Sequence, residues 1–299
     1  MMDYELFKSV FAKRILDYMP GDFKDHTPEV RKVKKVNRIK DGIILAPPEK
    51  DISVPLPTLY LDDLYEDFCT DEDMNRVLSN AAFVMMKYSG ESFEEARPDN
   101  LKNMKDRVVM NLINRDMNGE LLKDLPHREI MDLAIIYRIV VRTEEKGILS
   151  LMINHDVCRE MGLDEEELYR LARINTRRIF PAKIIDDEGP MCIMTNDAVI
   201  NGATTMLYKD EMKKLSDKIG GDFFILPSSV HEFFAIPTEY EDAGRLAQML
   251  AGGNGNVTDW SEVLSGSIYV YSAERNDLRI CAASVRPPAS FTATASEFI

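Results

Sequence analysis

The order of strand-like and helix-like segments between residues 190 and 281 constrains the fold of this chain most strongly. Strand patterns cover residues 191–195, 223–226, 230–236 and 267–272, and helical patterns cover residues 209–219 and 239–250. The helices have apolar residues every three or four positions, whereas β-branched and aromatic residues fill the strands. This β-α-β-β-α-β order is typical of a ferredoxin-like layer of two helices on one sheet. We therefore expect an α+β fold.

Residues 1–183 predict a separate α+β region. A helix runs to Pro20, a hairpin turns at Asn37 and Arg38, and two helices follow, with an N-cap at Thr70 between them. The stretch 101–114 is ambiguous between helix and strand. Strands are then expected over 129–141 and 147–153, before a helix that begins at Asp164, has acidic residues in its first turn and ends with arginines.

The domain boundary is expected in the polar string from Ile184 to Pro190, which contains both glycine and proline. This gives an N-terminal α+β region over 1–183 and a ferredoxin-like α+β domain over 190–281. The last segment, 282–299, is rich in alanine, serine, threonine and proline and has little periodicity. We expect it to be a flexible tail.

Composition excludes several classes of protein. A net charge of −14 disfavours nucleic-acid binding, which requires clustered lysine and arginine on the surface. The apolar stretches are too short and too often interrupted by charges to cross a membrane. Asp3 and Glu5 stand where an export signal has basic residues, and the four cysteines form no close pair. We therefore expect a cytoplasmic protein with reduced thiols and no membrane contact.

The segment from Leu226 to Phe234 contains the most suggestive group of reactive side chains. Ser228, Ser229, His231 and Glu232 place hydroxyl, imidazole and carboxylate groups within five positions, and serine–histidine chemistry uses such groups. However, neighbours in a regular strand point to opposite faces, so these residues could not all serve one site. A structural role for His231 is the more common outcome, and catalysis there is the alternative.

A second candidate site is acidic. Asp62, Asp63, Glu66 and Asp67 lie on one predicted helix, with a spacing that could present carboxylates to magnesium. An exposed acidic helix face is far commoner. The chain has no phosphate-binding loop, dinucleotide fingerprint or kinase motif, so we expect no cofactor.

Several segments resemble one bacterial family of unknown function, whose domain carries the number 5688. They are VKKVNRIKDGIIL, TLYLDDLYEDF, LPHREIMDLAIIYRIVV, DEEELYRLARINTRRIFP and MCIMTNDAVINGATTMLYKDEMKKLSDKIGGDFFILPSSVHEFFAIP. The resemblance spans most of the chain. It implies an origin in gut Firmicutes and an association with mobile elements, and it carries over no functional residue.

Two functional hypotheses follow. The first is a non-enzymatic cytoplasmic protein that binds a protein partner in a regulatory or accessory role. In a more specific version of this hypothesis, the protein interferes with a bacterial defence system. The alternative is a hydrolase or small-ligand-binding protein that uses His231 with Ser228 or Ser229. The sequence leaves the oligomeric state open.

Overall fold

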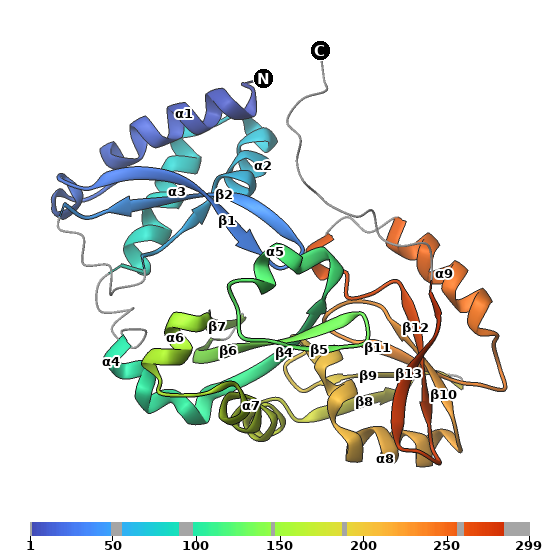
Figure 1. Ribbon diagram of the computed structural model, residues 1–299. Helices are drawn as coiled ribbons and strands as arrows, with labels where there is room; N and C mark the ends of the chain where they lie inside the picture. The colour runs from blue at the N-terminus through green and yellow to red at the C-terminus, as the bar shows by residue number, and fades with distance from the viewer. Residues whose placement is uncertain are drawn as a thin grey trace. The chain divides into compact units, whose positions relative to one another are not determined.

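The computed structural model describes residues 2–48, 56–89, 98–144, 147–186, 190–255 and 260–283. The chain forms two compact units (Figure 1). The first comprises residues 1–35 and 39–103, and the second comprises 36–38 and 104–299. The division therefore lies far from the string at 184–190. Strand β8 (Ala182–Asp186) pairs along its length with β9 (Cys192–Asn196), so both sides of that string belong to one sheet.

The first unit combines several helical elements with a small antiparallel sheet of order β1-β2-β3. Its helical elements are α1 (Tyr4–Arg14), η1 (Ile15–Tyr18), η2 (Gly21–Phe23), α2 (Leu61–Asp71), α3 (Met74–Lys87) and α4 (Pro98–Leu101). Its strands are β1 (Thr27–Lys35), β2 (Arg38–Ala46) and β3 (Leu59–Tyr60). The predicted first helix, hairpin and helix pair are all present. Their shared core contains Phe7, Phe11, Ile43, Phe68 and Leu78.

The cap between α2 and α3 differs from the prediction. The Asp73 carboxylate accepts hydrogen bonds from the backbone N–H groups of Asn75 and Arg76, at 2.9 and 3.1 Å, and is the N-cap of α3. Thr70 lies inside the last turn of α2, where its hydroxyl donates to the Asp67 carbonyl. The N-cap predicted at Thr70 is therefore wrong, because α3 begins three residues later and the Asp73 carboxylate accepts its free N–H groups.

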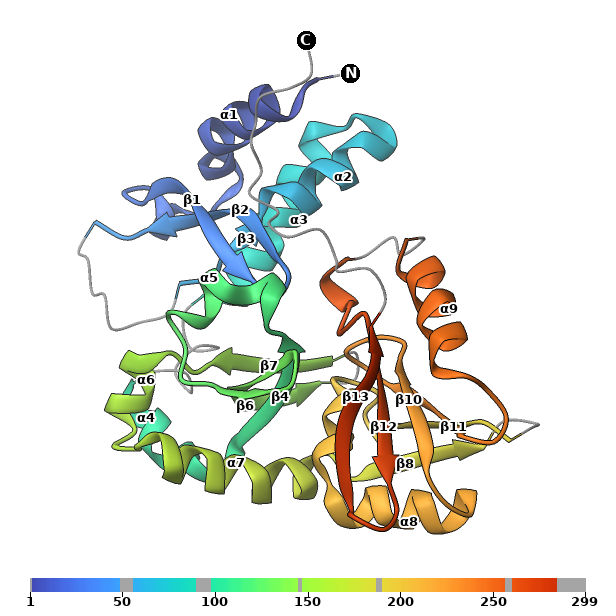
Figure 2. The same cartoon turned by 45° about the vertical axis from the view of Figure 1, so that its right-hand side comes forward.

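The second unit begins with a four-stranded antiparallel sheet around β6 (Leu133–Glu144). Strand β4 (Val108–Asn114) pairs with one edge of β6, and β5 (Arg128–Ile130) and β7 (Gly147–Met152) pair with the other. The predicted strand 129–141 is interrupted at Met131, which has φ of +57°. Helix α7 (Glu165–Ile179), capped by Asp164, packs against β4 (Figure 2). Shorter elements are η4 (Lys102–Arg107), η5 (Asp116–Asn118), α5 (Gly119–Leu122) and α6 (His155–Glu160).

The outer edge of β4 pairs with side chains instead of another strand. The N–H of Met110 donates to the Thr176 hydroxyl on α7 at 2.9 Å, and the N–H of Leu112 donates to the Thr204 hydroxyl at 3.3 Å. Thr204 belongs to η6 (Gly202–Leu207). Because buried backbone N–H groups need partners, these two threonines terminate the sheet without leaving donors unpaired.

A six-stranded antiparallel sheet completes the second unit, in the order β13-β12-β10-β11-β9-β8. Its remaining elements are α8 (Lys209–Ile219), β10 (Phe223–Pro227), β11 (Phe233–Pro237), α9 (Ala243–Gly255), η7 (Trp260–Glu262), β12 (Ser267–Ser272) and β13 (Asp277–Ala283). Leu246 and Leu250 of α9 pack against Ile236 and Ile268 of the sheet. The α+β class is confirmed, and the β-α-β-β-α-β order is present from β9 to β12.

This sheet also departs from the prediction in three places. Strands β8 and β13 were not expected, and β11 begins at Phe233 instead of Val230. The hairpin of β10 and β11 lies at the centre of the sheet, between β12 and β9. Ala282 and Ala283 of the predicted tail belong to β13, and residues 284–299 lie outside the described residues. None of the helices in the described part of the chain has the length and apolar content of a membrane span.

Candidate functional site

A cavity of about 380 Å³ lies within the second unit, over one face of the sheet formed by β4, β6 and β7. In the antiparallel register Val109 faces Arg138 and Asn111 faces Ile136, so these four side chains share one face. The apolar part of the lining includes Val109, Ile136, Val140, Ile148, Phe180 and Val230. Most of this surface would favour an apolar ligand group.

Three polar side chains interrupt this apolar face. Asn111 on β4, Arg138 on β6 and Ser150 on β7 lie on successive diagonals of the register, because Arg138 is opposite Val109 and Ser150 is opposite Val140. Diagonal neighbours on one sheet face are within reach of long side chains. We call these three residues the polar row. All three line the cavity.

Asn111 is the unusual member of the polar row. The residue is only 8% exposed, and its carboxamide makes no hydrogen bond to the residues that the structure describes. A carboxamide has two donors and an acceptor. The carboxamide of Asn111 is not among the fully buried unpaired groups of the described residues, so water or a ligand in the cavity can supply its hydrogen bonds.

Arg138 is positioned by Ser150. Its Nε donates to the Ser150 hydroxyl at 2.9 Å, and its Nη2 donates to the Ser150 carbonyl at 3.0 Å. These two bonds hold the planar guanidinium over the sheet face. Of the described residues that line the cavity, Arg138 alone carries a permanent positive charge and none is acidic.

His231 also lines the cavity, and its ring is oriented by the backbone. The Nδ1 atom accepts the N–H of Asn201 at 3.1 Å, and Nε2 lies 3.8 Å from Oε1 of Glu262. A neutral imidazole whose Nδ1 accepts a hydrogen bond carries its proton on Nε2. The ring can therefore donate from Nε2, while the lone pair of Nδ1 is already used.

The loop that carries His231 lies close to the backbone at the start of η6. The Thr195 hydroxyl donates to the His231 carbonyl at 2.8 Å, and the N–H of Ala203 donates to the Val230 carbonyl at 3.2 Å. A Cβ atom on Gly202 would lie 2.2 Å from Oγ1 of Thr195 and 2.3 Å from the His231 carbonyl oxygen. Only glycine fits at this position.

The other members of the predicted serine–histidine group lie elsewhere. The Ser228 hydroxyl is 3.3 Å from both the carbonyl and the carboxylate of Glu232, and the Ser229 hydroxyl accepts the N–H of His231 at 3.0 Å. Neither serine hydroxyl hydrogen-bonds the imidazole ring. Of these four residues, His231 lines the cavity. The hydroxyls of Ser228 and Ser229 form hydrogen bonds within residues 228–232.

The acidic group on α2 is engaged with neighbouring donors. Asp62 accepts the N–H of Asp41 at 2.8 Å, Asp63 pairs with Lys40, and Asp67 pairs with Arg76 at 2.9 Å. Glu66 is exposed. Within the described ranges, no group of three or more histidine, cysteine, aspartate or glutamate side chains is arranged to hold a metal ion.

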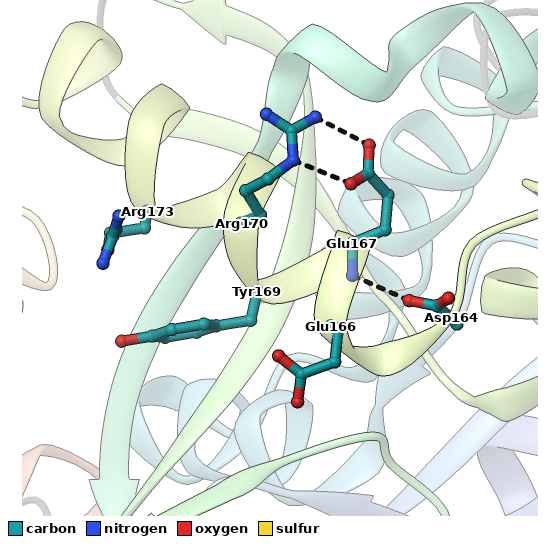
Figure 3. A pocket seen from close by; sticks show the side chains of 6 residues that line it. All are labelled: Asp164, Glu166, Glu167, Tyr169, Arg170 and Arg173. Carbon is teal, nitrogen blue, oxygen red and sulfur yellow. Dashed lines mark hydrogen bonds and ion pairs between the residues drawn. The ribbon is translucent and has the colours of Figure 1, made fainter.

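A second depression, of about 420 Å³, lies on the outer side of α7 (Figure 3). All of its lining residues come from this helix and its cap. Both side-chain oxygens of Glu167 accept hydrogen bonds from Arg170 at 2.7 Å, and Asp164 accepts the N–H of Glu167. Glu167 pairs with Arg170 within the helix, and Glu166 pairs with Arg128 of β5, so these carboxylates in the depression already have partners.

The polar row is visible in the sequence as single polar residues within two apolar strand segments. Asn111 and Arg138 are single polar residues in otherwise apolar strands, in VVMNLIN and IIYRIVV. A buried polar residue is a more informative feature than an apolar one. Their common face nevertheless depends on the register between β4 and β6, which the sequence does not specify.

The chain matches one known family over most of its length. Residues 4–187 and 185–273 match the model described as "Family of unknown function (DUF5688)". No curated protein and no solved structure matches the chain. Because the two matched segments cover most of its length, the chain belongs to the DUF5688 family of unknown function.

Proposed function

We propose that this protein binds a small molecule in the cavity beside His231 and acts as a non-enzymatic, cytoplasmic regulatory protein. The observation that carries the proposal is the unpaired carboxamide of Asn111, 8% exposed and facing a cavity of about 380 Å³. Ligand pockets are typically apolar, with a few oriented polar groups, and begin at roughly 300 Å³. The polar row and its apolar surroundings have this composition.

Binding is favoured over hydrolysis by the way the reactive groups are used. A serine nucleophile needs a hydrogen bond to a base that can accept its proton. The Nδ1 of His231 accepts a backbone N–H instead, and both serine hydroxyls hydrogen-bond within their own loop. In this proposal the ferredoxin-like half, residues 190–281 with β8 and β13 added, supplies the wall that contains His231.

Saturation-transfer NMR with a library of small molecules tests the proposal. The cavity variant is Ile200→Trp, because Ile200 is half-buried and lines the cavity, so a larger side chain there fills the space. The matched control is Ile174→Trp, at a position on α7 that is 53% exposed and outside the cavity. We expect compounds that bind the wild-type protein and the control but not the cavity variant. The proposal fails when no compound binds or when the cavity variant binds all of them equally.

A separate proposal, made from the sequence, is that the chain binds a protein partner. In its more specific version, that binding interferes with a bacterial defence system. Native mass spectrometry of the tagged chain recovered from a bacterial lysate tests it. A stoichiometric protein adduct supports a partner, and recovery of the bare chain at every ionic strength counts against one.

A further inference from the structure

Two carboxamides in the lining of the cavity have free hydrogen-bonding capacity. They belong to Asn111 on β4 and to Asn201 at the start of η6, and neither makes a side-chain hydrogen bond to the residues that the structure describes. The backbone N–H of Asn201 donates to His231, but its side chain takes no part in that bond. A carboxamide offers two donors and an acceptor and carries no charge.

His231 adds a neutral donor to these carboxamides. Its Nδ1 accepts the N–H of Asn201, so the proton of the neutral ring is on Nε2. The 3.8 Å between Nε2 and Oε1 of Glu262 is longer than a hydrogen bond. The N–H at Nε2 is therefore available to a ligand in the cavity.

The chemistry of a carboxamide selects a ligand that both donates and accepts. A carboxylate or phosphate only accepts, and would leave the carboxamide oxygens without donors. An ammonium group only donates, and would leave their N–H groups without acceptors. Asparagine is best matched by a group that presents a donor beside an acceptor, as adenine presents its amino group beside a ring nitrogen.

The apolar part of the lining selects a flat ligand. Val109, Val140 and Phe180 form one buried cluster, against which Ile148 packs. Aromatic rings stack on one another with an offset, and bases stack well on aromatic side chains. A planar heterocycle can place its faces against this cluster and its polar edges toward the carboxamides. At about 380 Å³ the cavity is at the small end of the range for organic ligands, which suits one ring or two fused rings.

We infer that the cavity binds a neutral, planar nitrogen heterocycle of the nucleobase type. Its edge bonds to the carboxamides of Asn111 and Asn201 and to Nε2–H of His231, and its faces lie against the cluster that contains Phe180. This inference rests on the proposed function, because it names the class of ligand for the same cavity.

Isothermal titration calorimetry of the full chain tests the inference with three matched pairs of probes. They are adenine and purine, cytosine and 2-pyrimidinone, and uracil and 2-pyridone. The second member of each pair lacks a hydrogen-bonding group of the first and is no larger, so a loss of affinity cannot come from a clash. In at least one pair we expect the base to bind about tenfold more tightly than its analogue. Adenosine, cytidine and uridine, each compared with its base, distinguish a nucleoside from a free base as the natural ligand.

Two variants assign the effect to the carboxamides. Asn111→Leu and Asn201→Gly are each expected to weaken binding of the preferred base about tenfold and to leave its analogue within about twofold. Glycine suits position 201, where φ is +53°, and it retains the backbone N–H that orients His231. Asn276→Gly is the matched control, because Asn276 also has a positive φ, of +50°, and lies outside the cavity. It should bind as the wild type does.

The outcomes separate the inference from the proposed function. When library compounds bind in the cavity but no base is preferred over its analogue, the inference is overturned and the proposed function stands. A preference that persists undiminished in both Asn111→Leu and Asn201→Gly also overturns the inference. When no library compound and no probe binds, the proposed function itself fails.

Discussion

Asn111 on β4 and Arg138 on β6 are diagonal neighbours on one sheet face, because Val109 is the register partner of Arg138 and Ile136 that of Asn111. The arginine side chain is held by Ser150, whereas the Asn111 carboxamide has no hydrogen-bonding partner among the described residues. The pair therefore combines a guanidinium held in place by Ser150 with an amide that is open to the contents of the cavity. A few oriented polar groups on an otherwise apolar face are typical of a ligand pocket.

Replacing Asn111 by leucine is expected to stabilise the protein. The change replaces a carboxamide that makes no hydrogen bond to the described residues by an apolar side chain on a mostly apolar face, and it should raise the free energy of unfolding by up to about 1 kcal/mol, measured by urea denaturation. Asn114→Leu is the matched control on the same strand. Asn114 is also buried, but its side chain donates to the Leu264 carbonyl and accepts the N–H of Met117. That variant should lose at least about 2 kcal/mol, and equal losses in both variants would contradict the account.

Gly202→Ala is expected to displace the His231 loop. The new methyl group would overlap Oγ1 of Thr195 and the His231 carbonyl, so the free energy of unfolding should fall by about 2 kcal/mol or more. Gly119→Ala serves as the control, because Gly119 begins a helix and has open space around its Cα. It should be neutral or slightly stabilising. A folded Gly202→Ala protein with an unchanged thermal midpoint would show that the close approach is not required.

Thr176→Val should destabilise the edge of β4. The N–H of Met110 would lose the Thr176 hydroxyl as its acceptor, at a cost of about 1–3 kcal/mol. Thr176→Ser retains the hydroxyl and should restore most of the loss. Hydrogen exchange at the Met110 amide gives a local measurement, and fast exchange is expected in the valine variant only. Equal protection in the valine and serine variants would count against the capping role.

The first unit should lose stability in acid through Asp41. Burial alone raises the pKa of this carboxyl, but hydrogen bonds from Lys32, Lys8 and Tyr4 outweigh it and hold the pKa below its usual range. A group with a depressed folded-state pKa stabilises the protein above its unfolded pKa of about 3.9, and this contribution is lost as the pH falls toward the folded value. The first unit should therefore weaken below about pH 4.

Asp41→Asn tests this pH dependence directly. The variant should cost about 2 kcal/mol at pH 7 and should lose less stability than the wild type between pH 5 and pH 3, measured by urea unfolding and circular dichroism. Asp22→Asn is a control because Asp22 is exposed in η2. Parallel stability curves for Asp41→Asn and the wild type would show that Asp41 does not contribute.

Local signals in the sequence predicted much of the fold. The helix that begins at Asp164, the hairpin turning at Asn37 and the helix ending at Gly220 each depend on neighbouring residues, and each is present. Strands β8 and β13 were missed, because both are edge strands that are held by pairing with distant segments. The start of β11 was placed too early because the apolar residue Val230 continues the strand pattern, although it lies in the loop before β11.

The candidate site was predictable only in part. His231 was identified as a candidate from its own sequence neighbourhood, together with Ser228 and Ser229. Its partners in the cavity, Asn111 and Arg138, are more than 90 positions away in the chain, and strand register alone brings them to one face. Nothing in a local motif could indicate that pairing. A search for single polar residues in buried strands would have found both.

The side-chain amide of Asn111 offers the most direct test of the account. Its ¹H–¹⁵N NMR signals can be assigned by their loss in Asn111→Leu and followed during a titration with a compound that binds the wild-type protein but not Ile200→Trp. The account predicts that these signals shift and saturate as the compound is added. Signals that stay unchanged while the compound binds would place the ligand elsewhere and contradict the proposed site.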